Sequence, residues 1–189
     1  GQDRYSKHGI AASVEEVGRE IEALVRVWPP LAKRRVDAVY FGGGTANLTP
    51  PKELRDLFAT LSRQFQLSGA EVTLEGVPAL FRSLLSGPLE ALLDVPARHR
   101  RISMGVQTFD EIQIKRMGRE RFGDRKTVAR VVEKAHRNGL TVSGDFLFNL
   151  PFQSLAQMRE DVRSASELGL DQICIYHLVL HPDQGTPWS

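Results

Sequence analysis

Apolar residues recur along the chain with two different periods, one typical of helices and one typical of short buried strands. The first helical stretch has an apolar residue every three or four positions from Val14 to Trp28. The Ser13-x-x-Glu16 pattern just before it has the form of a capping box. Because prolines at positions 29 and 30 disfavour continuation, we expect this helix to begin near Ser13 and to end at Trp28.

Five short segments rich in β-branched and aromatic residues are predicted to be strands, at 36–41, 71–75, 101–106, 141–148 and 172–179. Helical patterns lie between them, at 49–65, in pieces over 78–94, and at 110–117, 126–138 and 154–168. This alternation predicts the α/β class, a parallel sheet with helices outside it. No linker or low-complexity segment interrupts the pattern, so residues 1–189 are expected to form one domain, incomplete at both ends.

The composition argues against some classes of binding partner and some cell compartments. The 189 residues carry a net charge of +2, which does not indicate electrostatic binding to nucleic acid or to a membrane. No apolar run reaches the ~20 residues of a membrane span, and the N-terminus does not resemble a signal peptide, so a cytoplasmic protein is expected. Cys174 is the single cysteine, which excludes an internal disulfide, and we expect it to pack as a small hydrophobe.

Small and polar residues stand at the carboxyl ends of the predicted strands, where parallel α/β proteins bind their ligands. Residues 42–45 (Gly-Gly-Gly-Thr) follow the first strand, Glu75 ends the second, Gln107 follows the third and Asp145 lies within the fourth. Glycines expose backbone groups to a ligand, and the two carboxylates can bind a cation or ribose hydroxyls. Gln107 and Arg119 can bind an amide-like or carboxylate edge. The set suits a zwitterionic, ribose-bearing ligand better than a bare phosphate.

Each of these features also has an interpretation without a ligand. The glycine run can be a tight turn, and Arg119 can be a solvated member of a run of charges. Asp145 lies in an apolar strand, where an unpaired carboxylate is costly, so a functional role is favoured for it and, on the same ground, for Glu75. His177 and His181 are four residues apart, but they fall in a strand and a loop, so a metal site is not expected.

Five sequence motifs occur in the order found in one known family. They are VYFGGGT at 39–45, EVTLE at 71–75, RISMGVQTFD at 101–110 continued by KRMGR at 115–119, GDFLFNLPFQ at 144–153, and GTP at 185–187. They resemble the YFGGGTP, EVTLE, RISIGVQSFD, DLIFGLPGQT and GTP motifs of radical S-adenosylmethionine (SAM) proteins related to the oxygen-independent coproporphyrinogen III oxidases. Five motifs in order are far more specific than any one of them.

The resemblance implies a partial (β/α)6 barrel whose first strand is missing from the sequence. It implies SAM contacts at Gly43, Gly44, Thr45, Glu75, Gln107, Arg119 and Asp145, with Leu178 as a weaker candidate. It also implies a [4Fe–4S] cluster, which the family holds through a CxxxCxxC segment, and an electron donor such as flavodoxin or ferredoxin. That segment is absent here, and Cys174 cannot replace three thiolates, so the fragment alone is expected to be inactive.

In this family the reduced cluster cleaves SAM to a 5′-deoxyadenosyl radical, which removes hydrogen from the substrate. Three outcomes remain open: methyl transfer to a small or peptide-derived substrate, porphyrin-type oxidation, and heme delivery without catalysis. Ala46 stands where proline is usual, Asn149 where glycine is usual, and Gly76-Val77 where Ala-Asn is usual, which leaves the subfamily open. Outside the family, a phosphate-binding α/β-barrel enzyme remains an alternative.

Overall fold

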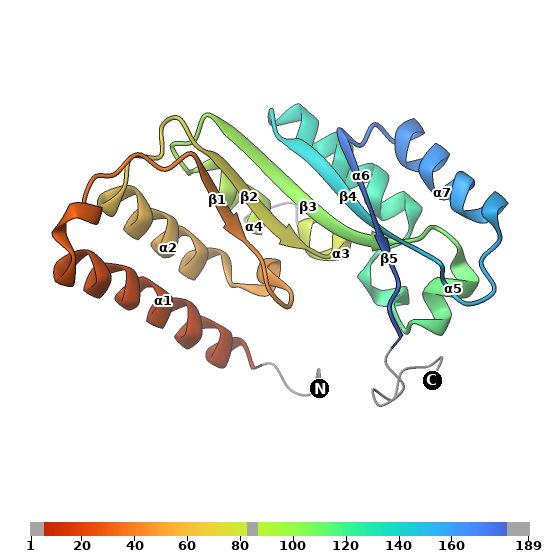
Figure 1. The fold of residues 1–189 in the computed structure, drawn as a ribbon, viewed down its shortest axis with the longest axis horizontal. Coiled ribbons are helices and arrows are strands. Elements are labelled where there is room, and N and C mark those ends of the chain that lie inside the picture. The colour runs from red at the N-terminus through yellow and green to blue at the C-terminus, as the bar shows by residue number, and fades with distance from the viewer. Residues whose placement is uncertain (1–5, 83–86, 181–189) are drawn as a thin grey trace.

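A computed structural model describes residues 6–82 and 87–180, and its core is one parallel sheet (Figure 1). Neighbouring strands pair in the order β1-β2-β3-β4-β5, every pairing parallel. The strands are β1 (Ala38–Phe41), β2 (Glu71–Gly76), β3 (His99–Gln107), β4 (Thr141–Phe148) and β5 (Gln172–His177). The predicted α/β class and all five predicted strands are confirmed, with differences of a few residues at their ends.

A helix or a pair of helices leads from each strand to the next. The α-helices are α1 (Lys7–Val27), α2 (Pro51–Gln64), α3 (Pro78–Phe81), α4 (Pro88–Leu93), α5 (Glu111–Arg116), α6 (Arg125–Arg137) and α7 (Leu155–Glu167). The described residues also form three short 3-10 helices, which the sequence patterns did not predict. They are η1 (Pro29–Leu31), η2 (Ala46–Leu48) and η3 (Glu120–Phe122). Figure 1 shows the sheet arching from β1 to β5, with α1 and α2 beside β1.

The first helix begins earlier than predicted, because Ser6 rather than Ser13 caps it. The Ser6 hydroxyl accepts a hydrogen bond from the Gly9 backbone N–H at 3.0 Å. Ser13 lies inside the helix and donates its hydroxyl hydrogen to the Gly9 carbonyl oxygen. The prediction that the helix begins near Ser13 was therefore wrong. The apolar stripe already starts at Ile10, four residues before Val14, so a helix that buries the whole stripe must start upstream of Ser13.

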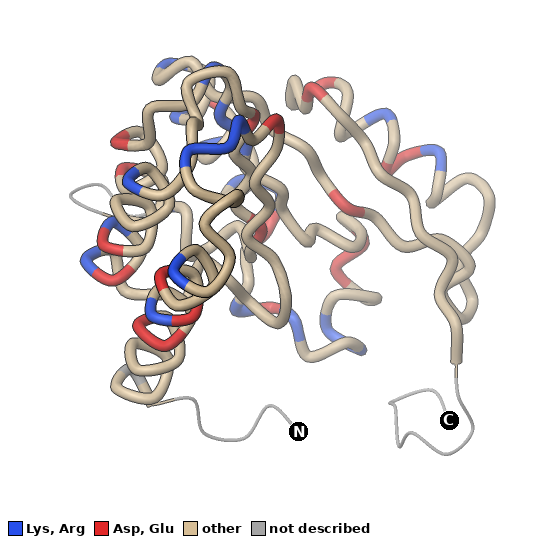
Figure 2. Tube along the Cα trace, turned by 60° about the vertical axis from the view of Figure 1, so that its left-hand side comes forward, with Lys and Arg blue, Asp and Glu red and all other residues tan. Residues whose placement is uncertain are grey.

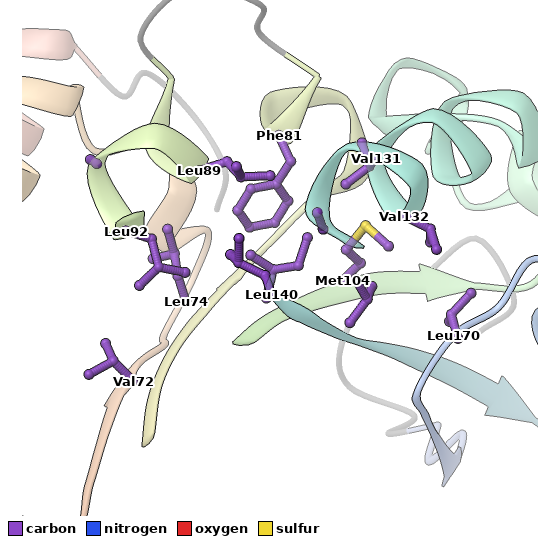
Figure 3. Close-up of a cluster of buried hydrophobic side chains, with 14 of the residues drawn as sticks. Val72, Leu74, Phe81, Leu89, Leu92, Met104, Val131, Val132, Leu140 and Leu170 are labelled. Atoms are coloured by element: carbon purple, nitrogen blue, oxygen red, sulfur yellow. The ribbon is translucent and has the colours of Figure 1, made fainter. Parts of the chain in front are cut away.

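The two faces of the sheet have opposite character, since side chains alternate along each strand. Val72 and Leu74 of β2 are buried, as are Ile102 and Met104 of β3. Figure 3 shows Leu74 and Met104 in one cluster with Phe81 of α3 and with apolar residues of α4 and α6. Each fully buried side chain of this size stabilises the fold by about 1.5–3 kcal/mol. The opposite face of the strands carries the polar residues.

Charged residues of both signs are interspersed over the helices (Figure 2). Several form exposed ion pairs within one helix, for example Lys52 with Asp56 in α2. Exposed pairs of this kind contribute little to stability, about 0–1 kcal/mol, so the apolar core holds the fold together. Across residues 6–82 and 87–180, no helix has the length and apolar character needed to cross a lipid bilayer.

Replacement of Gly144 by alanine tests how β4 packs. A Cβ atom at Gly144 would lie 2.2 Å from the Leu170 Cδ2 atom and 3.0 Å from the Phe146 Cε2 atom. We expect Gly144→Ala to lower the free energy of unfolding by about 1–3 kcal/mol in urea titrations. Gly18→Ala is the matched control, because nothing lies within 4 Å of that Cβ position and alanine favours a helix by about 0.5–1 kcal/mol. A Gly144→Ala variant as stable as the wild type would contradict this packing.

Candidate functional site

The polar face of the sheet brings together residues from neighbouring strands. Glu75 of β2 pairs with Ser103 of β3, Gly105 of β3 pairs with Asp145 of β4, and Asp145 pairs with Cys174 of β5. Paired positions on adjacent strands lie side by side on the same face. The carboxylates of Glu75 and Asp145, predicted from sequence as ligand-binding groups, therefore share one face near the carboxyl ends of the strands.

Asp145 is a half-buried carboxylate, and its hydrogen-bond donors in the described part of the chain are neutral groups. The Ser103 hydroxyl donates to Asp145 Oδ2 at 3.1 Å, and the Ser143 hydroxyl donates to the Ser103 oxygen at 2.9 Å. Burial raises the pKa of the Asp145 carboxyl, and hydrogen bonds from Ser103 and Cys174 together with the charge of Arg101 offset part of this rise. Within residues 6–82 and 87–180, Asp145 forms no ion pair, so its charge is available to a ligand.

Glu75 is in contact with both β1 and the glycine loop (residues 42–45). The Tyr40 hydroxyl donates to Glu75 Oε2 at 3.3 Å. Burial, with Glu75 beside it, raises the pKa of the Tyr40 hydroxyl and keeps it a donor. A Cβ atom at Gly42 would lie 2.6 Å from Glu75 Oε2 and 2.5 Å from the Tyr40 Cε1 atom. The first glycine of the loop thus lets the Glu75 carboxylate approach the backbone closely.

The next two glycines give the loop its shape. Gly43 and Gly44 have φ angles of 90° and 63°, in the left-handed region that residues with a side chain rarely adopt. Both are exposed, so their backbone groups are accessible to a ligand. The Thr45 carbonyl oxygen accepts a hydrogen bond from the Leu48 N–H at 2.9 Å and so starts η2. The glycine loop therefore turns sharply and presents its backbone at the end of β1.

Gln107 and Arg119 meet at Gly105. Gln107 has a φ angle of 73° at an irregularity of the β3–β4 pairing, and its Nε2 atom lies 2.9 Å from the Cβ position of Gly105. An Arg119 NH2 group donates to the Gly105 carbonyl oxygen at 3.0 Å, and the guanidinium lies 4.8 Å from the centre of the Phe122 ring. Burial lowers the pKa of Arg119. In the described part of the chain no carboxylate pairs with it, which leaves donors for an anionic group.

A buried carboxylate fixes the loop that follows Gln107. Asp161 of α7 accepts hydrogen bonds from the Thr108 hydroxyl and from the Phe109 backbone N–H, each at 2.7 Å. Burial raises the pKa of Asp161, and these two hydrogen bonds counteract the rise. The two donors are fixed on the loop, so Asp161 limits how far Gln107 can move. Its role is therefore structural.

The predicted site residues divide into a cluster and two outlying parts. Glu75, Gln107, Arg119 and Asp145 surround Ser103 and Gly105 on the polar face. The glycine loop touches this cluster through Gly42. It also lines a groove of about 560 Å³ among α1, α2 and β1 that does not include Glu75 or Asp145. Leu178 continues the β4–β5 pairing, donating its N–H to the Phe148 carbonyl at 3.0 Å, and its proposed contact stays a prediction.

Cys174 does not pack as the small hydrophobe that the sequence suggested. The register places it opposite Asp145 on the polar face, and Gln172 Nε2 lies 3.4 Å from its sulfur atom. The apolar neighbours Ile173 and Ile175 made Cys174 look like a core residue in the sequence. They point to the other face of the strand, because side chains alternate along it. Cys174 therefore belongs to the polar face as a partly exposed thiol.

His177 contacts Asn149 and not a metal-binding group. Its Nε2 atom lies 2.9 Å from Asn149 Nδ2, and its ring packs on Phe148. In the described ranges, no group of three or more His, Cys, Asp or Glu side chains is arranged to hold a metal ion. His181 and the GTP motif at 185–187 lie outside the described residues.

Sequence reasoning missed four residues of the polar face, namely Tyr40, Arg101, Ser103 and Ser143, and also Asn47 of η2. Strand periodicity could have found three of them. Ser143 is two residues before Asp145, Ser103 is four before Gln107, and Tyr40 is two before Gly42, so alternation places each on the same face as a residue that the sequence had already singled out. Asn47 had no such signal, since it lies in a 3-10 helix.

Asp145→Asn is expected to stabilise the ligand-free protein at pH 7. The pKa of Asp145 is raised in the folded state, so the carboxyl group favours folding below its ordinary value of 3.8 and this contribution is lost as pH rises through the folded pKa. The increase in the free energy of unfolding that asparagine gives should therefore become larger from about pH 4 to pH 7, as measured by urea unfolding.

Asp161→Asn is the comparison, because an amide offers one oxygen to the two donors that Asp161 binds, and this variant should be less stable than the wild type. A loss of stability in Asp145→Asn at pH 7 would show that the charge of Asp145 is compensated within the protein.

Comparisons with known proteins show the family of the chain. A sequence profile of the radical SAM superfamily matches residues 2–165. Anaerobilin synthase of Escherichia coli O157:H7 is 30% identical over 182 residues, which cover 94% of this chain and 38% of the relative. The heme chaperone HemW of Lactococcus lactis is 28% identical over 162 residues, covering 85% of this chain and 41% of the relative.

A solved structure shares the fold. Coproporphyrinogen III oxidase (HemN) from Escherichia coli, a radical SAM enzyme, matches with a TM-score of 0.80 at 24% identity, over 95% of this chain and 39% of that chain. The expected fold, a parallel-stranded partial barrel of the radical SAM type, is confirmed. The chain spans about two fifths of the length of these proteins. On its sequence and its fold, this chain belongs to the radical SAM superfamily, in the group related to coproporphyrinogen III oxidase.

Proposed function

We propose that the polar face at the strand ends binds SAM. The observation that carries the proposal is a set of half-buried charged groups that form no ion pair in the described part of the chain. They are two carboxylates, Glu75 and Asp145, and one guanidinium, Arg119. Charges held out of water need compensation. SAM offers an ammonium group, a sulfonium cation and ribose hydroxyls to the carboxylates, and a carboxylate to the guanidinium. A bare phosphate offers nothing to Glu75 or Asp145.

Each residue has a proposed role that follows from its chemistry. The backbone of Gly43 and Gly44, with Thr45, faces the amino group of the methionyl part. Glu75 and Asp145 hold cationic groups or ribose hydroxyls, while Gln107 and Arg119 hold the carboxylate or an amide-like edge of the nucleoside. Leu178 is proposed as an apolar contact. Tyr40 and Ser103, which donate to the two carboxylates, keep those groups oriented before the ligand arrives.

The cofactors of the radical SAM superfamily are SAM and a [4Fe–4S] cluster, which together supply a 5′-deoxyadenosyl radical when both are bound. The residues of the polar face fit SAM. They do not fit the cluster, because cluster binding needs thiolates from several cysteines and the sequence contains Cys174 alone. The chain's own residues are therefore assigned to SAM, and residues 1–189 are proposed to be one part of a larger barrel domain.

Two activities are proposed for the complete protein. The first is radical chemistry on a small or peptide-derived molecule, by porphyrin-type oxidation or by methyl transfer, with electrons from a donor such as flavodoxin or ferredoxin. The second is heme delivery, which the 28% identity to a heme chaperone supports. Both use the same fold, and both are compatible with SAM on the polar face.

Two assays separate these activities. If the protein is an enzyme, the protein that carries its cluster should form 5′-deoxyadenosine from SAM together with consumption of substrate, as measured by chromatography after anaerobic reduction. If it delivers heme, the Soret band of added heme should shift on binding at equimolar concentration. Bound heme without substrate consumption would contradict the enzymatic proposal, and substrate consumption without heme binding would contradict the second candidate.

Removal of either carboxylate is expected to weaken SAM binding. Glu75→Ala and Asp145→Ala should each raise the dissociation constant of SAM about tenfold or more in calorimetric titrations, because each removes a charge-assisted interaction of about 1.5–3 kcal/mol. Glu133→Ala is the control, since Glu133 is an exposed carboxylate that pairs with Arg137 on the outer surface of α6. Affinities equal to the wild type in both site variants would refute the proposed site.

A further inference from the structure

One buried side chain connects the glycine loop to the strand that carries Glu75. Asn47 lies in η2, two residues after Thr45, and only 3% of it is exposed. Its Nδ2 atom donates to the Val77 carbonyl oxygen at 3.0 Å, and its Oδ1 atom accepts from the Val77 backbone N–H at 3.1 Å. The side-chain amide thus pairs with both backbone groups of Val77, as a neighbouring strand would, and extends the sheet past the end of β2.

This pairing requires that residue 76 has no Cβ atom. A Cβ atom at Gly76 would lie 1.9–2.3 Å from three side-chain atoms of Asn47, its Cγ, Oδ1 and Nδ2. The amide of Asn47 therefore occupies the space that any larger residue at position 76 would fill. Glycine at position 76 and asparagine at position 47 therefore form a matched pair.

The two partners lie beside residues of the proposed SAM site. Asn47 lies two residues after the glycine loop, and Gly76 and Val77 follow Glu75 directly. β1 and β2 pair over only four positions, ending at Phe41 with Leu74, so the regular pairing stops before the glycine loop and Glu75. Beyond that point, the two hydrogen bonds of Asn47 join the segments on either side of the site.

We propose that Asn47 is a positioning residue that sets the distance between the glycine loop and the Glu75 carboxylate, and that Gly76 is required because Asn47 fills its side-chain space. The proposal rests on the proposed binding of SAM to this face. Asn47 acts through the backbone and does not touch the ligand. Its loss lets the glycine loop move relative to Glu75, and a ligand that spans both segments is then bound less tightly.

A double-mutant cycle tests the proposal with SAM as the probe. The variants Asn47→Ala, Gly76→Ala and the combination of both are purified as the full chain, and SAM affinity and the thermal midpoint are measured on the same samples. Each single change should weaken SAM binding about tenfold, Gly76→Ala because its methyl group displaces the amide of Asn47. The second change should cost little further affinity in the double variant, since the alanine methyl then meets no amide.

Gly69→Ala is the matched control at the other end of β2, where nothing lies within 4 Å of the Cβ position, and it should bind SAM as the wild type does. A lower thermal midpoint with unchanged SAM affinity, measured well below that midpoint, would overturn the positioning role and leave only a structural one. Additive losses in the double variant would overturn the matched pair. Absence of SAM binding in the wild type would instead refute the proposed function itself.

Discussion

The polar face of this protein carries charged groups that the fold partly removes from water and does not neutralise with ion pairs in the described part of the chain. Asp145 and Glu75 share the polar face of a parallel sheet, and Arg119 lies near the same strand ends. Burial raises the pKa of Asp145 and lowers that of Arg119, so the ionised forms of both are less stable here than in solvent. Such an arrangement costs folding free energy in the absence of a ligand. It becomes favourable when one ligand supplies the opposite charges.

The rest of the fold keeps these groups in place. Apolar residues on the helical side of β2, β3 and β4 bury one face of the sheet, which fixes the polar residues on the other. Neutral donors then orient the carboxylates: the Tyr40 hydroxyl on Glu75 and the Ser103 hydroxyl on Asp145. Asp161 holds the loop after Gln107, and Asn47 holds the glycine loop. Preorganisation of this kind lowers the cost of ordering the site when ligand binds.

Much of the fold could be predicted because its signals are local. Strand periodicity and glycine turns predict the order of elements, and the motifs predict which strand ends carry the site. The predicted start of the first helix was wrong. The capping box at Ser13 is a local pattern, and the run of apolar residues that begins at Ile10 requires the helix to start before it. The face of the sheet on which Cys174 lies is set by the register of β5 against β4, which pairs Cys174 with Asp145. The local sequence around Cys174 does not encode that register. Asn47 reaches Val77 thirty residues away, a contact that no local pattern encodes.

The central claim is that the separate strand ends bind one ligand as a single site. Its most direct test is a titration of the ¹⁵N-labelled protein with SAM, followed by the amide signals of Gly43, Gly44, Gly105, Gln107 and Asp145. If the strand ends form one site, all of these signals shift and saturate with the same dissociation constant. Signals that shift at the glycine loop alone, or that saturate at different SAM concentrations, would contradict it.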